Sequence, residues 1–212
     1  MPALFLYEPR MLLRTVVTSL VEGNDSAIQS FPVLPHLTEN VCSSTAENKI
    51  MLVGLGGAGA AFPDLLRFIR SVKTFKVKTL VWVPDEYPWL QKLLSTIYAG
   101  RIILEENLGS ALLPALNELS GLKTISYRSS NATKRPRRMT QTELEILLQF
   151  ASGLSSREMA DNRKCSYKTI FSWKHNICEA LNIETNAQWL EMLTEIVQLS
   201  SMYQAGQSYG SL

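Results

Sequence analysis

The chain lacks the residues that several classes of protein require. Its 212 residues contain three cysteines, Cys42, Cys165 and Cys178, an odd number without the paired spacing of a zinc or redox site. The two histidines, His36 and His175, lie in distant segments, and neither a Gly-x-Ser-x-Gly nor a His-Glu-x-x-His motif is present. We therefore expect no disulfide framework, no metal site, no cofactor, no small-molecule substrate and no enzymatic activity.

Long apolar runs are also missing. The longest, such as Ile50 to Leu55 and Thr79 to Val83, have the length of a strand and fall far below the ~18 residues of a membrane span. The first residues include no basic region and reach Glu8 too early for a secretory signal. With 46% hydrophobic and 19% charged residues, the composition is typical of a globular protein. We expect a cytoplasmic protein without a membrane partner.

The net charge is only +2, but the positive residues are clustered. Four cations fall within Lys134-Arg135-Pro136-Arg137-Arg138, directly after a polar stretch without apolar periodicity. This pattern predicts a basic linker over residues 128–138, between an N-terminal domain at 1–127 and a C-terminal domain at 139–203. Residues 204–212, rich in Ser, Gly and Gln, are expected to be a disordered tail. By itself the basic run suits a solvated hinge as well as phosphate contacts.

The C-terminal segment contains four helix starts. Thr140, Ser155 and Thr185 are each followed three residues later by Glu or Gln, which makes a capping box, and Ser166 provides a cap alone. Apolar residues recur at helical spacing after each cap, and Gly153 suits the left-handed position that ends the first helix. The segment is therefore predicted to be an all-α domain of four helices.

The third of these helices has an unusual polar face. Burial of Ile170, Ile177 and Leu181 leaves an opposite face that mixes a cation, an aromatic ring, a hydroxyl and an imidazole. Lysine and serine can reach base edges or phosphates, histidine can donate or accept, and phenylalanine can rest on a thymine methyl. We therefore predict that this helix reads double-stranded DNA. The face consists of Lys168, Phe171, Ser172 and His175, and the other candidate DNA contacts are Lys164, Ser166, Thr169, Lys174, Arg137 and Arg138.

These helices resemble the LuxR-type helix-turn-helix of the NarL/FixJ regulators. Within that family, the stretch from Ser166 to His175 is similar to RcsB-type capsule regulators and their auxiliary partners, although Phe171 stands where the family often has a base-contacting lysine. The resemblance implies a bacterial transcription regulator that acts as a homodimer or as a heterodimer with a related response regulator. It also implies that the fourth helix dimerises. The resemblance is carried by Met139-Thr140, Glu143, Ile146-Leu147, Gly153-Leu154-Ser155, Glu158-Met159-Ala160, Lys168-Thr169-Ile170, Asn176-Ile177 and Leu181-Asn182-Ile183, and the expected dimer contacts are Trp189, Leu193 and Val197.

The N-terminal segment alternates strand and helix patterns, which predicts an α/β domain. Residues 23–47 show little periodicity, although a strand and a short helix fit there. The spacing resembles a receiver domain, a flavodoxin-like α/β fold. The expected strands are Leu4 to Tyr7, Lys49 to Val53, Thr79 to Val83 and Arg101 to Leu104, and the expected helices are Met11 to Val21, Pro63 to Lys73, Trp89 to Tyr98 and Gly109 to Leu119.

The chemistry of a working receiver is absent. Such a domain needs an acidic pair for Mg²⁺, an aspartate that accepts phosphate, and then a hydroxyl and a lysine that sense it. Aligned by strand order, the first position offers only Glu8, the phosphoacceptor position holds Gly54, the hydroxyl position holds Val83 and the lysine position holds Glu105. Without a carboxylate nucleophile no acyl phosphate can form. We predict a pseudo-receiver that works independently of phosphorylation.

Two alternatives remain open. The stretch from Gly54 to Gly59 matches the Gly-x-Gly-x-x-Gly pattern of dinucleotide-binding loops, and Asp85 or Glu86 could hold a ribose hydroxyl. In that case a nucleotide-sensing domain would be fused to the DNA-binding module. Because Phe171 departs from the family pattern, the protein could instead be an interaction protein that sequesters related regulators without reading DNA. The operator, the target genes and the sign of regulation are not encoded in any motif.

Overall fold

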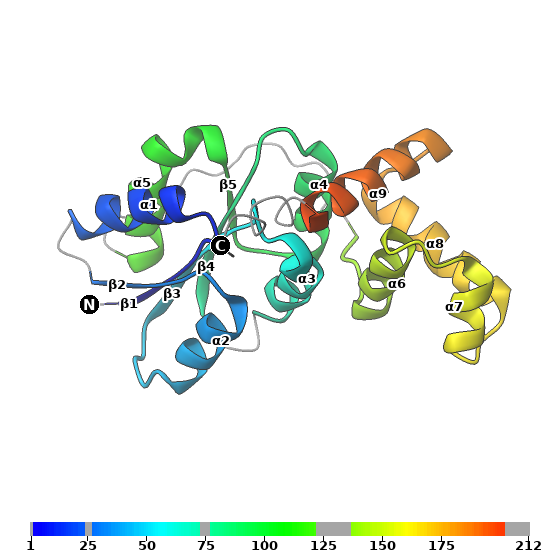
Figure 1. Ribbon diagram of the computed structural model, residues 1–212, viewed down its shortest axis with the longest axis horizontal. Coiled ribbons are helices and arrows are strands. Elements are labelled where there is room, and N and C mark those ends of the chain that lie inside the picture. The colour runs from blue at the N-terminus through cyan, green and yellow to red at the C-terminus, as the bar shows by residue number, and fades with distance from the viewer. Residues whose placement is uncertain (1, 24–26, 73–76, 122–136, 202–212) are drawn as a thin grey trace, which may run out of the picture.

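The protein consists of a five-stranded sheet flanked by helices and, at one end of it, a group of four helices (Figure 1). The structure is a computed structural model that describes residues 2–23, 27–72, 77–121 and 137–201. Most of the predicted linker and the whole predicted tail at 204–212 lie outside these residues. In the described part of the chain, no helix is both long and apolar enough to cross a bilayer.

All five strands are parallel, in the order β2-β1-β3-β4-β5. The central strands are continuous apolar runs because helices cover both of their faces. This strand order is that of a flavodoxin-like domain, so the predicted fold class is confirmed. The strands are β1 (Ala3–Tyr7), β2 (Ile28–Phe31), β3 (Lys49–Gly54), β4 (Lys78–Val83) and β5 (Arg101–Leu104).

Helices α1 and α5 cover one face of the sheet, and α2, α3 and α4 cover the other. The weakly patterned stretch at 23–47 contains both β2 and α2, the strand and short helix that were expected there. Two 3-10 turns, η1 (Gly59–Ala61) and η3 (Glu105–Asn107), lie beyond the carboxyl ends of β3 and β5. The helices are α1 (Met11–Glu22), α2 (Leu34–Ser43), α3 (Phe62–Ser71), α4 (Pro88–Ile97) and α5 (Leu108–Ser120).

The C-terminal helices begin at the predicted caps. The hydroxyls of Thr140 and Ser155 accept from the N–H groups three residues on, and both capping boxes are complete. Thr185 makes the same reciprocal pair with Gln188, and Ser166 accepts from the Thr169 N–H at 3.1 Å. Each cap satisfies donors that the first turn of a helix leaves without partners. The four helices are α6 (Gln141–Ala151), α7 (Ser156–Asn162), α8 (Tyr167–Leu181) and α9 (Asn186–Ser201).

Helix α6 ends as the sequence predicts. Gly153 has a φ of 88°, in the left-handed region that glycine adopts without steric cost. The Leu154 N–H bonds to the Gln149 carbonyl and the Gly153 N–H to the Phe150 carbonyl, which together make a Schellman motif. This turn directs the chain into α7 and so fixes the angle between the first two helices of the group.

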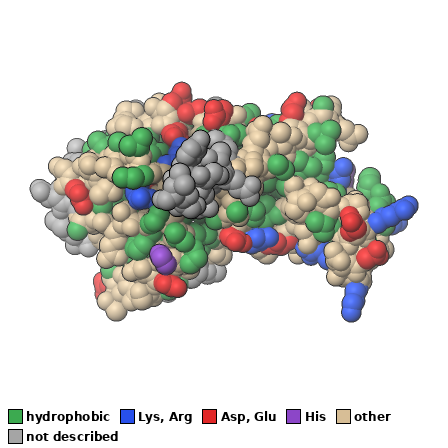
Figure 2. All heavy atoms as spheres, in the orientation of Figure 1, with side chains coloured by type: hydrophobic (Ala, Val, Ile, Leu, Met, Phe, Trp, Pro, Cys, Tyr) green, Lys and Arg blue, Asp and Glu red, His purple; other side chains and the backbone are tan. Residues whose placement is uncertain are grey.

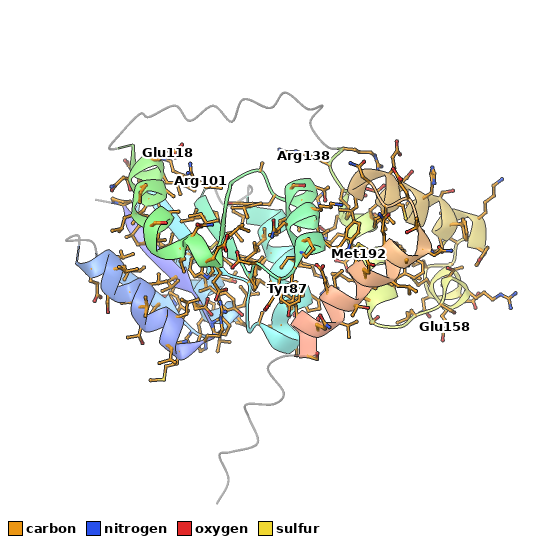
Figure 3. The ribbon with its side chains drawn as sticks, turned by 90° about the horizontal axis from the view of Figure 1, so that it is seen from above. Tyr87, Arg101, Glu118, Arg138, Glu158 and Met192 are labelled. Atoms are coloured by element: carbon orange, nitrogen blue, oxygen red, sulfur yellow. The ribbon has the colours of Figure 1, made fainter. Side chains whose placement is uncertain are left out.

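The two units pack against each other along α9, which lies over η1, α3 and α4. Figure 3 shows Tyr87, just before α4, and Met192 on α9 at this junction. Arg67 on α3 makes two parallel hydrogen bonds of 2.8 Å with Glu145 on α6. The Met139 N–H donates to the carbonyl of Thr96, and one apolar core runs through both units. The sequence gives no sign of this docking, because its contacts join segments tens of residues apart.

Candidate nucleic-acid interface and receiver pocket

The predicted reading face of α8 is exposed. Lys168, Phe171, Ser172 and His175 all lie open to solvent, while Ile170 and Ile177 on the opposite side are buried. Helices α7 and α8 occupy the end of the molecule farthest from the sheet, and Lys and Arg side chains project from that end (Figures 1 and 2). The packing of the two units therefore leaves this face uncovered.

Lys164 and Lys168 are the cations best placed to meet a polyanion. Lys164 lies in the turn between α7 and α8 with a φ of 51°, and its side chain is exposed. Among the residues that the structure describes, neither side chain has a hydrogen bond or ion pair. Both ammonium groups can therefore reach phosphates without breaking an internal contact.

Two other predicted DNA contacts are already used inside the fold. The hydroxyl of Ser166 accepts from the Thr169 N–H and lies 2.9 Å from the Thr169 hydroxyl. Both hydroxyls therefore close the first turn of α8. The Ser172 hydroxyl donates to the Lys168 carbonyl at 3.0 Å, but its oxygen stays exposed on the reading face. Ser166 and Thr169 thus set the direction of the helix that carries the face.

The two arginines at the end of the predicted linker differ. Arg137 donates to the Glu143 carboxylate at 2.7 Å and to the Asn176 carbonyl at 3.0 Å, so it joins α6 to α8. Burial opposes ionisation of Glu143, but the hydrogen bonds from Thr140 and Arg137 outweigh it and hold the pKa of this carboxyl below its ordinary value. Arg138 is exposed and carries no such contact among the described side chains. Of the pair, Arg138 is the one free to meet a phosphate.

Lys174 does not share the reading face. Its Nζ lies 4.8 Å from the centre of the Trp189 ring and 5.8 Å from that of Phe150, over an edge-to-face aromatic pair. A cation above an aromatic face is attracted by the electron-rich ring. In this position Lys174 helps to hold α8 against α6 and α9.

One exposed aromatic residue was missed from the sequence. Tyr167, the first residue of α8, is 51% exposed and lies beside Phe171, which is 54% exposed. Their ring centres are 5.8 Å apart. The spacing i, i+4 of two aromatic residues on the polar side of an amphipathic helix could have revealed the pair, because such residues face each other on a helix.

The predicted dimer residues on α9 divide into two groups. Trp189 is buried and packs edge-to-face on Phe150, so it belongs to the core. Leu193 is partly buried against that core, whereas Val197 is 45% exposed. Leu190, seven residues before Val197, is 61% exposed and was not among the predicted contacts. The exposed large apolar residues of α9 among those described are therefore Leu190 and Val197.

The carboxyl edge of the sheet contains an internal ion bridge. The guanidinium of Arg10 donates to Glu8, which is fully buried, through Nε and Nη2 at 2.9 Å. It also donates to Glu105 through Nη1 at 2.7 Å and Nη2 at 3.0 Å. The Trp82 indole N–H completes the shell of Glu8 at 3.1 Å. One cation that belongs to the chain thus joins the carboxyl ends of β1 and β5.

The charges of this bridge stabilise one another. Burial disfavours the charged form of Arg10, but the hydrogen bonds that it donates to Glu8 and Glu105 outweigh this effect and raise the pKa of the guanidinium further above its ordinary value. The side chain of Arg10 remains 32% exposed, and that of Glu105 25%. The Arg10 side chain therefore stays charged at any pH the folded protein meets.

The glycines of the loop after β3 make room for this bridge. A Cβ at Gly54 would lie 2.0 Å from Glu8 Oε2 and 2.7 Å from Trp82 Nε1, and one at Gly56 would lie 2.7 Å from the Arg10 guanidinium. Gly57, with a φ of 72°, would meet the Arg10 stem at 2.7 Å. These glycines therefore allow the side chains of Glu8, Trp82 and Arg10 to lie close to the backbone of the loop. The presence of the glycines is explained by this packing and does not require a bound nucleotide.

The hollow above the loop is acidic. It has a volume of about 540 Å³ and lies at the carboxyl edge of the sheet. The Asp85 carboxylate accepts from the N–H of Glu106, and the single cation at the wall, Arg10, is already paired. Such a lining repels a pyrophosphate, which weakens the nucleotide alternative. The residues around it are Arg10, Gly56, Gly57, Pro84, Asp85, Glu86, Glu105 and Glu106.

Fold and surface together define a receiver-like α/β domain joined to a helix-turn-helix domain. Residues 137–193 match the family model of the bacterial regulatory proteins of the luxR family. This segment is a LuxR-family helix-turn-helix domain, as predicted. The match covers the C-terminal unit alone and ends within α9.

Three further likenesses extend over more of the chain. The oxygen regulatory protein NreC of Staphylococcus carnosus is 24% identical over 155 residues, which span 73% of this chain and 65% of that relative, less than two thirds of its length. The structure resembles the response regulator RcsB in an RcsB–DNA complex, with a TM-score of 0.58 and 19% identity over 91% of this chain and 98% of the other. RcsB from Salmonella enterica serovar Typhimurium, bound to promoter P1flhDC, gives a TM-score of 0.57 over 92% and 98% at 19% identity. At 19% identity, the likeness to RcsB establishes the fold alone.

Proposed function

We propose that the protein is a sequence-specific DNA-binding transcription regulator of bacterial type. The observation that carries the proposal is the open face of α8, where Lys168, Phe171, Ser172 and His175 stand exposed in a LuxR-family helix-turn-helix domain. In helix-turn-helix proteins the second helix of the motif enters the major groove and presents such residues to base edges. The fold relative RcsB has been solved in complex with DNA, which agrees with this role.

The regulator acts without phosphorylation. Gly54 ends β3 at the position of a phosphoacceptor and offers no nucleophile, and the Glu8 carboxylate and the Trp82 indole fill the space beside it. The Glu8–Arg10–Glu105 bridge gives the pocket a permanent, internally paired set of charges instead of an exchangeable phosphate and metal ion. The activity of the regulator therefore depends on the amount of the protein and on its partners.

The active species is a dimer, formed with a second copy or with a related regulator. Leu190 and Val197 present apolar surface on α9 that nothing in the described part of the chain covers. Leu193 lies between them along the helix, at the edge of the core. In a two-fold arrangement the same stripe from each chain would pack against the other. Val197→Glu should shift the protein to monomer in light scattering, whereas Val16→Glu on α1, equally exposed, should not.

DNA binding is tested by fluorescence anisotropy of a labelled duplex selected from a random pool. The double variant Lys164→Ala/Lys168→Ala should bind more weakly and lose about two units of the slope of log affinity against log salt. Lys78→Ala, which removes a cation from β4 in the α/β unit, serves as the charge control. Unchanged affinity and salt slope in the double variant would exclude direct contact through this face. Acetyl phosphate should leave the affinity of every form unaltered.

A further inference from the structure

Two aromatic rings stand exposed side by side at the head of α8. Tyr167 and Phe171 are separated by one helical turn, with ring centres 5.8 Å apart and ring planes inclined by 41°. More than half of each residue is open to solvent, so neither ring contributes much to the core. Large apolar side chains gathered on an exposed functional surface mark an interaction site more often than isolated ones do.

The surroundings of the pair indicate the kind of partner. Lys164 and Lys168 are exposed near the pair, and residues 162–178 contain no Asp or Glu. The free ammonium group of Lys168 lies on the same face as the Phe171 ring, and the Ser172 and His175 side chains border it. A surface with apolar centre and positive rim fits a polyanion that presents an apolar group between its charges. In the major groove of DNA, that group is the 5-methyl of thymine.

We propose that Tyr167 and Phe171 form a thymine-reading pair that sets the base preference of the regulator. The inference rests on the proposed DNA-binding function and names the bases that this face selects. The Phe171 ring lies against one thymine methyl, and Tyr167 extends the apolar surface toward the next base pair. The separation of 5.8 Å between the rings falls between one and two base steps of about 3.4 Å each.

The chemistry of Phe171 also determines what this position rejects. A lysine or arginine there would donate to the acceptors O6 and N7 of guanine, whereas a phenyl ring donates nothing. Guanine opposite the ring would lose its hydration without gaining a partner, which carries a free-energy penalty. The face therefore favours A·T pairs at the position of Phe171, with Lys168 beside it free for a phosphate or a neighbouring base.

Replacement of thymine by deoxyuridine, which removes only the methyl group, tests the proposal. The full-length protein first selects a duplex from a random pool, and each thymine of that duplex is then replaced in turn. At contacted positions the affinity should fall about fourfold for each methyl removed. Phe171→Ala should bind the thymine and deoxyuridine duplexes equally well at the position that Phe171 reads. Tyr167→Phe, which keeps the ring, and Leu190→Ala, which removes an exposed apolar residue elsewhere, should preserve the discrimination.

The possible outcomes separate this inference from the function on which it rests. If a defined sequence is selected but thymine and deoxyuridine duplexes bind alike, the thymine assignment is wrong and DNA reading stands. If no duplex is preferred over random DNA, the proposed function fails first, and the pair becomes a protein-docking surface. Discrimination that persists in Phe171→Ala would also overturn the assignment to this ring. Melting curves of Phe171→Ala and of Phe171→Leu, which keeps apolar bulk, verify that the variants are folded.

Discussion

The carboxylate of Glu195 on α9 accepts a hydrogen bond from the backbone N–H of Leu90, 3.0 Å away in the first turn of α4. Helix α4 begins without a side-chain cap of its own, because Tyr87 stands at its N-cap position. A glutamate of the C-terminal domain thus caps a helix of the N-terminal domain, and Glu191 adds a hydrogen bond from the Trp89 indole at 3.4 Å. The capping of α4 therefore depends on the packing of α9 against it.

Removal of this cap should loosen the docking. Glu195→Ala leaves the Leu90 N–H without its partner, so we expect a loss of about 1 kcal/mol in the free energy of unfolding. Glu195→Gln keeps a carbonyl acceptor and should lose much less. Urea unfolding gives the free energies, and amide exchange at Leu90 locates the effect. Equal stability of the alanine variant and the parent would show that the contact contributes nothing.

The free energy of unfolding should change with pH in two ranges, one set by Glu145 and the other by Glu195. The hydrogen bonds from Arg67 hold the pKa of Glu145 below its ordinary value, so its contribution is present above about pH 4.3 and is lost as the pH falls through the lower folded value. Burial raises the pKa of Glu195 above its ordinary value, against the hydrogen bonds from Leu90 and Trp89. Its contribution is therefore present at low pH and is lost as the pH rises through that higher value.

Free energies of unfolding measured between pH 3 and pH 8 separate the two contributions. Glu145→Gln should reduce the loss of stability at acidic pH, and Glu195→Gln should reduce the loss of stability as the pH rises. Glu118→Gln, which removes an exposed partner of Arg101 far from the junction, is the control (Figure 3). If Glu145→Gln leaves the loss of stability at acidic pH unchanged, the Arg67–Glu145 pair does not couple the docking of the two units to pH.

Loss of the central cation should destabilise the α/β domain. Arg10→Met leaves the buried Glu8 carboxylate with the Trp82 indole and the Arg10 backbone N–H as donors, and an unpaired buried charge is costly. We expect a loss of about 2 kcal/mol, below the range for fully buried pairs because the Arg10 side chain is partly exposed. The double variant Glu8→Gln/Arg10→Met removes the stranded charge and should recover part of it. A double variant less stable than Arg10→Met alone would refute this account.

A carboxylate introduced at Gly54 should not become phosphorylated. In Gly54→Asp the new Cβ would fall 2.0 Å from Glu8 Oε2, so the strand end has to shift, and a carboxylate is placed beside another buried one. We expect a lower melting temperature and, after incubation with acetyl phosphate and Mg²⁺, no phosphoaspartate by intact-mass spectrometry. Detection of a phosphorylated aspartate, in this variant or in the parent, would show that the pocket retains receiver chemistry.

Nucleotides should not bind the loop from Gly54 to Gly59. The guanidinium of Arg10 occupies the space that the glycines provide, and Asp85, Glu86 and Glu106 line the hollow above it. NAD or ATP at millimolar concentration should leave the melting temperature unchanged. A saturable rise that disappears in Gly56→Ala would revive the nucleotide-sensing alternative.

Much of the architecture follows from local patterns, because the positions of strands and of helix caps are set by short stretches of chain. The strand Arg101–Leu104 and the caps at Thr140 and Ser166 lie where the sequence places them. The pair of Arg10 with Glu105 could not be foreseen, since 95 residues separate the partners and only the sheet order brings them together. The position of Lys174 over Trp189 likewise depends on how α9 packs, which periodicity does not specify.

The bridge made by Arg10 holds the carboxyl edge of the sheet together with a part of the chain itself. A metal ion can be chelated and a phosphoryl group hydrolysed, whereas a guanidinium tethered to the backbone can neither diffuse away nor be removed by an enzyme. Because Gly54 has no room for a β-carbon while Glu8 and Trp82 keep their places, the side chains at this edge constrain one another, and a change at one of these positions requires the others to move.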